Sequence, residues 1–298
     1  MTLSPIFQNS NIIKNIFVPH VSKEKAKRAS HPPKPVPNFK QRLHLLHMDF
    51  CCPMRIVSIN GKWYVLVIVD DYSCYTWVLF VKSKDEAPEE IKIFLNKITI
   101  RLQATVTVIK TDNRTEFKNQ ILKEYFDSVG ISHQASSFRT PQQNGVVERR
   151  NRTLVEVARR MLILSRASLF LWAEATATAC YTQNCSIIHR RFVKTSYELI
   201  NGRKQDISFL HVFGALYYPK NDHEDIGKLS AKGDIGFFIG YSANSCAYSV
   251  YNRRTKKIME TMNVTFDELS AMDFEQNSLK PRLQSMTSGQ ISSRLDLA

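Results

Sequence analysis

Short runs of apolar and β-branched residues alternate with polar stretches through the first half of the chain. These runs occupy residues 43–50, 62–69, 75–81, 105–109 and 131–135. Because successive side chains of a strand point to opposite faces, the pattern predicts up to five β-strands. Turn-prone residues at positions 70–73 separate the second run from the third.

Helical spacing appears between and after these strands. Apolar residues recur with helical periodicity in residues 86–101, 117–129, 140–165 and 169–188. Gly130 favours the end of the second helix. The third helix has two candidate starts, because Thr140-Pro141 and Asn144-Gly145 are both typical of helix N-termini. Strands mixed with helices predict an α/β domain over roughly residues 41–190.

The pattern of apolar and polar residues changes after Gly202. Short apolar runs separated by turn residues predict a small all-β module, and they lie at residues 209–218, 236–241, 247–251, 257–262 and 264–266. Residues 1–40 hold six of the eleven prolines and seven Lys or Arg against one acid, which is typical of a basic, extended arm. Residues 269–298 are polar and aperiodic, and we expect them to form a disordered tail.

Composition narrows the choice of function. The 298 residues are 43% hydrophobic, which excludes global disorder. No apolar run approaches the roughly 18–20 residues of a membrane span, and we expect no signal peptide. The six cysteines form no CxxC pair, so neither a disulfide scaffold nor a zinc ribbon is expected. The formal net charge of +14 favours a polyanionic partner such as nucleic acid.

Three acids lie at the ends of predicted elements. Asp49 ends the first strand, Asp112 follows the fourth, and Glu148 lies near the start of the third helix. Carboxylates so placed can bind two divalent ions, which stabilise the attacking and leaving oxygens of a phosphoryl transfer. Spacing alone does not distinguish the three from ordinary surface acids.

The helix that carries Glu148 is rich in arginine. Its arginines are Arg149, Arg150, Arg152, Arg159 and Arg160. At about 100° per residue, Arg152 and Arg159 lie within about 40° of Glu148 on the helix surface. A surface ion-pair network is the commonest interpretation of such a helix. A helix that faces DNA phosphates is the alternative.

The start of this helix and the residues before it read Thr140-Pro141-Gln142-Gln143-Asn144-Gly145-Val146-Val147-Glu148-Arg149-Arg150-Asn151-Arg152-Thr153-Leu154. Further motifs lie at residues 47–49, 69–73, 111–113, 130–134, 172–175, 211–214 and 238–241. In their sequence and order, these motifs resemble the integrases of copia-type retrotransposons, over about residues 18–268. The resemblance implies an RNase H-like core at residues 41–200, with a mixed five-stranded sheet and flanking helices. It also implies a small β-barrel-like module at residues 205–268.

The same resemblance implies a polynucleotidyl transferase that integrates DNA. Asp49, Asp112 and Glu148 would be its catalytic and metal-binding acids, with Mg²⁺ or Mn²⁺ as the cofactor. A DNA 3′-hydroxyl would attack a target phosphodiester, while the arginine helix positions DNA. The implied partners are element ends, target DNA and further copies of the chain, in the nucleus or elsewhere inside the cell, with no membrane.

Two departures from the family pattern bear on activity. Val18 and Val21 replace the cysteines of a zinc knuckle, and valine has no donor atom, so we expect no zinc. Arg114 and Thr115 stand where the family has two glycines, which predicts strained positive φ angles and weaker Mg²⁺ binding. Glu116 is either a further metal ligand or a first-turn helix acid.

These departures favour an alternative interpretation. In it, the chain is a catalytically decayed or co-opted integrase remnant that binds nucleic acid or a protein partner. A nuclease on the same fold is a third interpretation, in which water replaces DNA as the nucleophile.

Overall fold

The computed structural model describes residues 41–51, 53–137, 144–219, 236–242, 247–262 and 264–267. The chain divides into two units, Met1–Asn38 and Phe39–Ala298, and every described residue belongs to the second. The predicted arm and tail therefore lie outside the described residues, as do Val18 and Val21. Within the described ranges, no helix is both long and apolar enough to cross a bilayer.

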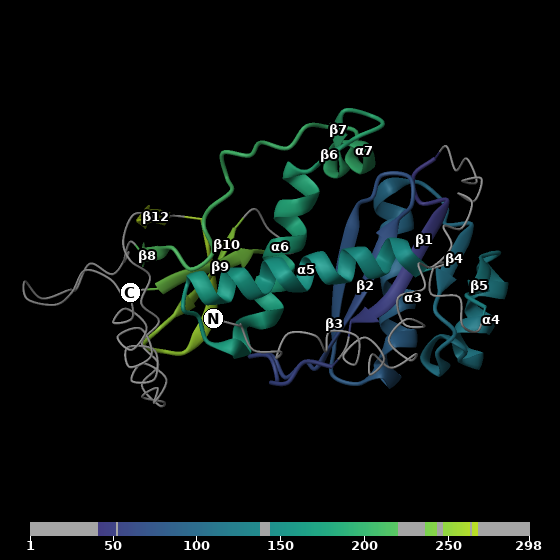
Figure 1. Cartoon of the computed structure of the whole chain (residues 1–298), viewed down its shortest axis with the longest axis horizontal. Helices are drawn as coiled ribbons and strands as arrows, with labels where there is room; N and C mark the ends of the chain where they lie inside the picture. The colour runs from purple at the N-terminus through teal and green to yellow at the C-terminus, as the bar shows by residue number, and fades with distance from the viewer. Residues whose placement is uncertain are drawn as a thin grey trace, which may run out of the picture. The chain divides into compact units, whose positions relative to one another are not determined.

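Five strands form a mixed sheet in the order β3-β2-β1-β4-β5 (Figure 1). They are β1 (Leu45–Cys51), β2 (Tyr64–Asp70), β3 (Thr76–Val81), β4 (Val108–Thr111) and β5 (Ser132–Ala135). The first three strands pair antiparallel, whereas β4 runs parallel to β1 and β5 runs parallel to β4. This arrangement confirms the predicted mixed five-stranded sheet.

Helices cover both faces of this sheet (Figure 1). They are α3 (Ala87–Leu102), α4 (Gln120–Val129), α5 (Gly145–Leu164) and α6 (Trp172–Ser186). Alternation along β1 and β2 divides their side chains between two hydrophobic clusters. Met48 and Ile68 are buried in one cluster with residues of α3 and α4. Val67 and Val69 are buried in the other with residues of α5 and α6.

The element boundaries agree with most of the predicted ones. Helix α5 begins at Gly145, the later of the two candidate starts, while residues 140–143 lie outside the described part. Gly130 ends α4 with a φ of 74°, and its N–H donates to the carbonyl of Phe126. The strand predicted at residues 105–109 forms later, at β4. The short elements are the 3-10 helices η1 (Lys84–Glu86), η2 (Thr115–Phe117) and η4 (Leu169–Leu171), with β6 (Ile188–His189), β7 (Lys194–Thr195) and α7 (Ser196–Asn201).

A second sheet contains five antiparallel strands in the order β11-β10-β9-β8-β12. They are β8 (Leu216–Pro219), β9 (Gly236–Tyr241), β10 (Tyr248–Asn252), β11 (Lys257–Thr261) and β12 (Val264–Asp267). The all-β module is thus confirmed, and its described strands form an open sheet rather than a closed barrel. Residues 209–215, which the pattern includes in a strand, precede β8 without strand structure.

The second sheet packs directly on helix α6. Phe237 and Ile239 of β9 are buried in the same hydrophobic cluster as Ala175 of α6. The hydroxyl of Thr178 donates a hydrogen bond of 2.8 Å to the carbonyl of Ile239. A Cβ at Gly240 would lie 2.7 Å from the Thr178 hydroxyl oxygen, so glycine permits this close approach.

Candidate active site

Asp49 lies on the central strand β1 and is covered by α5. Its side chain belongs to a residue only 8% exposed, and Nδ2 of Asn151 donates a hydrogen bond of 2.9 Å to its Oδ2. Burial, followed by the negative charges of Asp112 and Glu148, raises the pKa of Asp49 to about 6, against the opposing charge of Arg114. A cation at this place would favour the ionised carboxylate, which burial disfavours.

Asp112 directly follows β4. The register pairs Thr111 of β4 with Met48 of β1, so Asp112 and Asp49 come to neighbouring positions at one end of the sheet. Burial raises the pKa of Asp112, and the charge of Arg114 opposes this effect. Nε of Arg114 lies 2.6 Å from Oδ2 of Asp112.

Glu148 lies in the first turn of α5 and is exposed. Its negative charge is one of the causes that raise the pKa of Asp49, so Glu148 lies within electrostatic range of that acid. The three predicted acids come from three separate elements: β1, the end of β4, and the start of α5.

The chemistry of this donor set fits a divalent cation. Carboxylate oxygens are the ligands that Mg²⁺ prefers. Oδ1 of Asn151, next to Asp49, is buried and has no hydrogen-bond partner among the described residues. In the described part of the chain, however, no three His, Cys, Asp or Glu side chains are arranged to share one metal ion. The cation beside Asp112 in this arrangement is the guanidinium of Arg114.

Asn151 is a site residue that the sequence reasoning misses. It is 9% exposed and holds Asp49 through its amide nitrogen. The available signal was its position three residues after Glu148, which places both on one helix face. A neutral amide gives no charge signal, so the pattern of acids and arginines passes over it.

The arginines of α5 differ in their surroundings. Arg149, Arg152, Arg159 and Arg160 are exposed, as a DNA-facing helix requires, and Arg160 also pairs with Glu156. Arg150 is half-buried instead, and its guanidinium donates 2.9 Å to the carbonyl of Cys74. This hydrogen bond ties α5 to the turn after β2, and the predicted DNA contact of Arg150 stays a prediction.

The backbone strain predicted at Arg114 and Thr115 is wrong. Arg114 is extended, with φ −78° and ψ 155°, and Thr115 opens the 3-10 helix η2. Neither has a positive φ. The chain passes Asp112 without a left-handed residue, so glycine is not required there. Only the charge of Arg114 remains as a departure with chemical consequences.

Glu116 has a structural partner. Nζ of Lys84 lies 2.7 Å from its Oε1, and the Glu116 side chain is 8% exposed. Burial acts to raise its pKa, but the hydrogen bond from Lys84, a backbone hydrogen bond and the charges of Lys84 and Arg114 together lower it. The acid therefore belongs to a local ion pair that joins η2 to η1.

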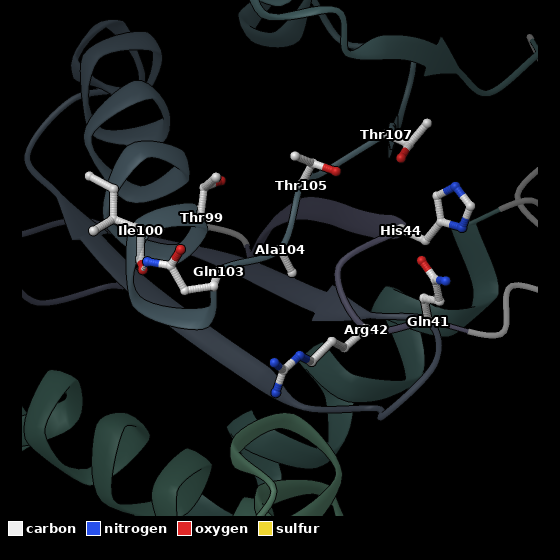
Figure 2. Close-up of a pocket in the computed structure, with 9 residues that line it drawn as sticks. All are labelled: Gln41, Arg42, His44, Thr99, Ile100, Gln103, Ala104, Thr105 and Thr107. Carbon is white, nitrogen blue, oxygen red and sulfur yellow. Dashed lines mark hydrogen bonds between the residues drawn. The ribbon is translucent and has the colours of Figure 1, made fainter.

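A polar hollow of about 740 Å³ is lined by nine residues, none of which is one of these acids (Figure 2). It adjoins His44, before the amino end of β1, whereas Asp49 lies toward the other end of the strand. The lining residues are Gln41, Arg42, His44, Thr99, Ile100, Gln103, Ala104, Thr105 and Thr107. None is a carboxylate, and Arg42 donates to the carbonyls of Ile200 and Leu102. The hollow carries none of the chemistry assigned to the three acids.

Comparison with known proteins supports the resemblance. Residues 40–141 match the family described as "Integrase core domain", and residues 215–280 match "Retroviral polymerase SH3-like domain". The retrovirus-related Pol polyprotein from transposon TNT 1-94 of Nicotiana tabacum is 32% identical over 76% of this chain, which spans 17% of that protein. The Pol polyprotein from transposon RE1 of Arabidopsis thaliana is 32% identical over 72% of this chain, which spans 14% of it.

More distant similarities include a yeast transposon polyprotein and a retroviral integrase. The transposon Ty1-DR6 Gag-Pol polyprotein of Saccharomyces cerevisiae is 27% identical over 76% of this chain, which spans 13% of that protein. Among solved structures, the HTLV-2 integrase catalytic core domain in complex with magnesium has a TM-score of 0.42 at 23% identity, over 54% of this chain and 98% of that one. With its integrase core domain, retroviral SH3-like domain and copia-type relatives, this chain belongs to the retrotransposon integrase family.

Proposed function

We propose that this chain joins DNA ends to target DNA by phosphoryl transfer. The observation that supports the proposal is the strand register that brings Asp49 and Asp112 to neighbouring positions, together with the charges of Asp112 and Glu148, which help to raise the pKa of the buried Asp49. A site that concentrates carboxylates in this way is suited to phosphoryl transfer assisted by divalent cations. The proposed attacking group is the 3′-hydroxyl of the DNA end. The proposed leaving group is the 3′-oxygen of the target strand at the attacked phosphodiester.

The residues of the chain have separate tasks in this proposal. Asp49, Asp112 and Glu148 would hold Mg²⁺ or Mn²⁺, which when bound activates the attacking hydroxyl and neutralises charge on the phosphate. Asn151 fixes the orientation of the Asp49 carboxylate through its hydrogen bond. Burial of Asp49 keeps the carboxylate out of bulk water and strengthens its attraction for a cation.

A strand-transfer assay on the whole chain tests the proposal. Labelled DNA ends and a target duplex are incubated with Mg²⁺ or Mn²⁺, and we expect joined products. Cleaved target without joining would assign the site to a nuclease instead. DNA binding with neither product would favour the decayed remnant, an alternative that the ion pair between Arg114 and Asp112 specifically supports.

The exposed arginines of α5 should make DNA binding sensitive to salt. Each neutralised phosphate contributes about −0.9 to the slope of log affinity against log salt concentration. Changing Arg152 and Arg159 together to Ala should flatten that slope by up to about two. Fluorescence anisotropy of a labelled duplex across a salt series measures it.

A matched control removes the same charge from the other side of the sheet. Lys97 of α3 and Lys123 of α4 are exposed, and their helices cover the face opposite to α5. Their double alanine variant should keep the parental slope. Equal slopes in the arginine variant and the parent would mean that DNA does not lie along α5.

The assembly and location of the protein belong to the same proposal. We expect a homo-oligomer on element ends and target DNA, acting in the nucleus or within a particle inside the cell. The resemblance to integrases supports this expectation. Sedimentation of the whole chain with and without DNA ends measures the oligomeric state, and a monomer under both conditions would contradict it.

A further inference from the structure

One guanidinium faces several acids of the candidate site. Nε of Arg114 lies 2.6 Å from Oδ2 of Asp112, and its backbone N–H lies 3.4 Å from Oδ1 of the same carboxylate. The positive charge of Arg114 also acts on Glu116, whose pKa is lowered, and on Asp49, whose raised pKa it partly offsets. Arg114 is therefore in direct contact with Asp112, and its charge acts on two further acids.

Lys84 is the direct partner of Glu116, which leaves Arg114 to pair with Asp112. Its Nζ pairs with Glu116 at 2.7 Å and lies 5.9 and 5.8 Å from the ring centres of Phe50 and Tyr64. The Glu116 charge is thus already compensated by a lysine held against two aromatic rings. The charge of Lys84 also acts on Asp112, but Arg114 makes the direct contact with the Asp112 carboxylate.

We propose that Arg114 is a built-in counterion that occupies the acid site until a divalent cation and DNA displace it. The inference rests on the proposed function and adds a step before catalysis. A guanidinium in contact with Asp112 repels a second cation at the same oxygens, and it shields the charge that would attract that cation.

DNA offers Arg114 an alternative partner. The Arg114 side chain is 48% exposed, whereas that of Asp112 is 15% exposed, so the arginine has room to turn outward while the acid stays in place. A phosphate binds guanidinium through two parallel hydrogen bonds and competes well with a carboxylate. DNA binding therefore frees Asp112, and metal binding frees Arg114 for DNA.

This exchange makes the two ligands cooperative. Coupling between sites is reciprocal, so DNA should raise the affinity for the metal by the same factor by which the metal raises the affinity for DNA. Typical couplings of this kind change affinity about 5–150-fold. A cleavable or joinable substrate is not needed to observe the effect, because it concerns binding alone.

Titration of the whole chain with Mn²⁺ tests the proposal without an activity readout. Bound Mn²⁺ is measured by electron paramagnetic resonance, with and without a short duplex. Arg114→Ala should bind Mn²⁺ at least about five-fold more tightly than the parent in the absence of DNA. The duplex should tighten Mn²⁺ binding in the parent and have little effect in Arg114→Ala.

Two further variants distinguish a failure of the counterion inference from a failure of the proposed metal site. Lys118→Ala removes an exposed positive charge four residues from Arg114 and should leave Mn²⁺ affinity within about two-fold of the parent. If Arg114→Ala binds Mn²⁺ no better than Lys118→Ala or the parent, the counterion inference is wrong while the metal site stands. If Asp112→Asn binds Mn²⁺ as well as the parent, the metal assignment of the proposed function fails, and the counterion inference fails with it.

Discussion

Replacing Asp49 by asparagine should stabilise the folded chain at pH 7 while abolishing DNA joining. Asp49 is 8% exposed, and burial and its acidic neighbours raise its pKa from the ordinary 3.8 to about 6. Such a difference corresponds to about 3 kcal/mol of free energy lost on ionising the group in the folded state. Asparagine has the shape of the protonated acid, carries no charge, and can still accept the hydrogen bond from Asn151.

The sign of the effect follows from the direction of the pKa change. A raised pKa means that the folded chain binds the Asp49 proton more tightly than the unfolded chain does. The stabilisation from this proton is full below about pH 4 and is lost as the pH rises through about 6. The Asp49→Asn variant should therefore match the parent near pH 4 and exceed it by up to about 3 kcal/mol at pH 7.

Urea unfolding at both pH values measures the difference in the free energy of unfolding. Asp127→Asn, an exposed acid on α4, serves as the control and should change stability by no more than about 0.5 kcal/mol. Added Mn²⁺ should stabilise the parent but not Asp49→Asn. A variant less stable than the parent at pH 7 would contradict this prediction. It would show that the ionised Asp49 carboxylate stabilises the folded chain through its contacts.

Replacing Asp112 by asparagine should reduce strand transfer on the order of 10²–10³-fold or more, because a bound metal supplies several kcal/mol of transition-state stabilisation. The fold should change little. The ion pair that is lost involves a half-exposed arginine, and such pairs contribute up to about 1 kcal/mol. Joined product is measured in the same assay as for the parent, over a range of Mg²⁺ and Mn²⁺ concentrations.

Glu116→Gln is the matched control for this variant. It also removes one negative charge near Arg114, but from an acid already paired with Lys84. We expect it to retain most of the parental strand transfer. Joining by Asp112→Asn at the parental rate would remove Asp112 from the catalytic set.

Much of the fold could be predicted because its strands and helices have distinct periods. The alternation around Met48 and Ile68 gave the first two strands, and the glycine at 130 gave the end of α4. Strand β4 was displaced toward Thr111, since its position depends on parallel pairing with β1, which local residue preferences do not encode. The module was predicted to be barrel-like, but its described strands form an open sheet. Whether a sheet closes depends on pairing between its first and last strands, which the local sequence pattern does not encode.

The charged residues of the candidate site could be named from the sequence, whereas the contacts that their side chains make could not. The sequence motif identifies the three acids, and strand order brings Asp49 beside Asp112. The contacts of Asn151 and Arg150 could not be predicted, because they depend on which groups of other elements face these side chains. At Arg114 the expectation of strain came from the family glycines, whereas the actual backbone is extended.

The close packing of β9 on α6 sets the size of the unit that can be exchanged between related chains. Thr178 and Gly240 approach too closely to admit a larger residue at position 240 without displacement. A chimera that combines this catalytic sheet with another chain's β-module must therefore preserve both sides of the contact. The two segments constrain each other's substitutions, so we expect them to be exchangeable only as one piece although they belong to separate layers of the fold.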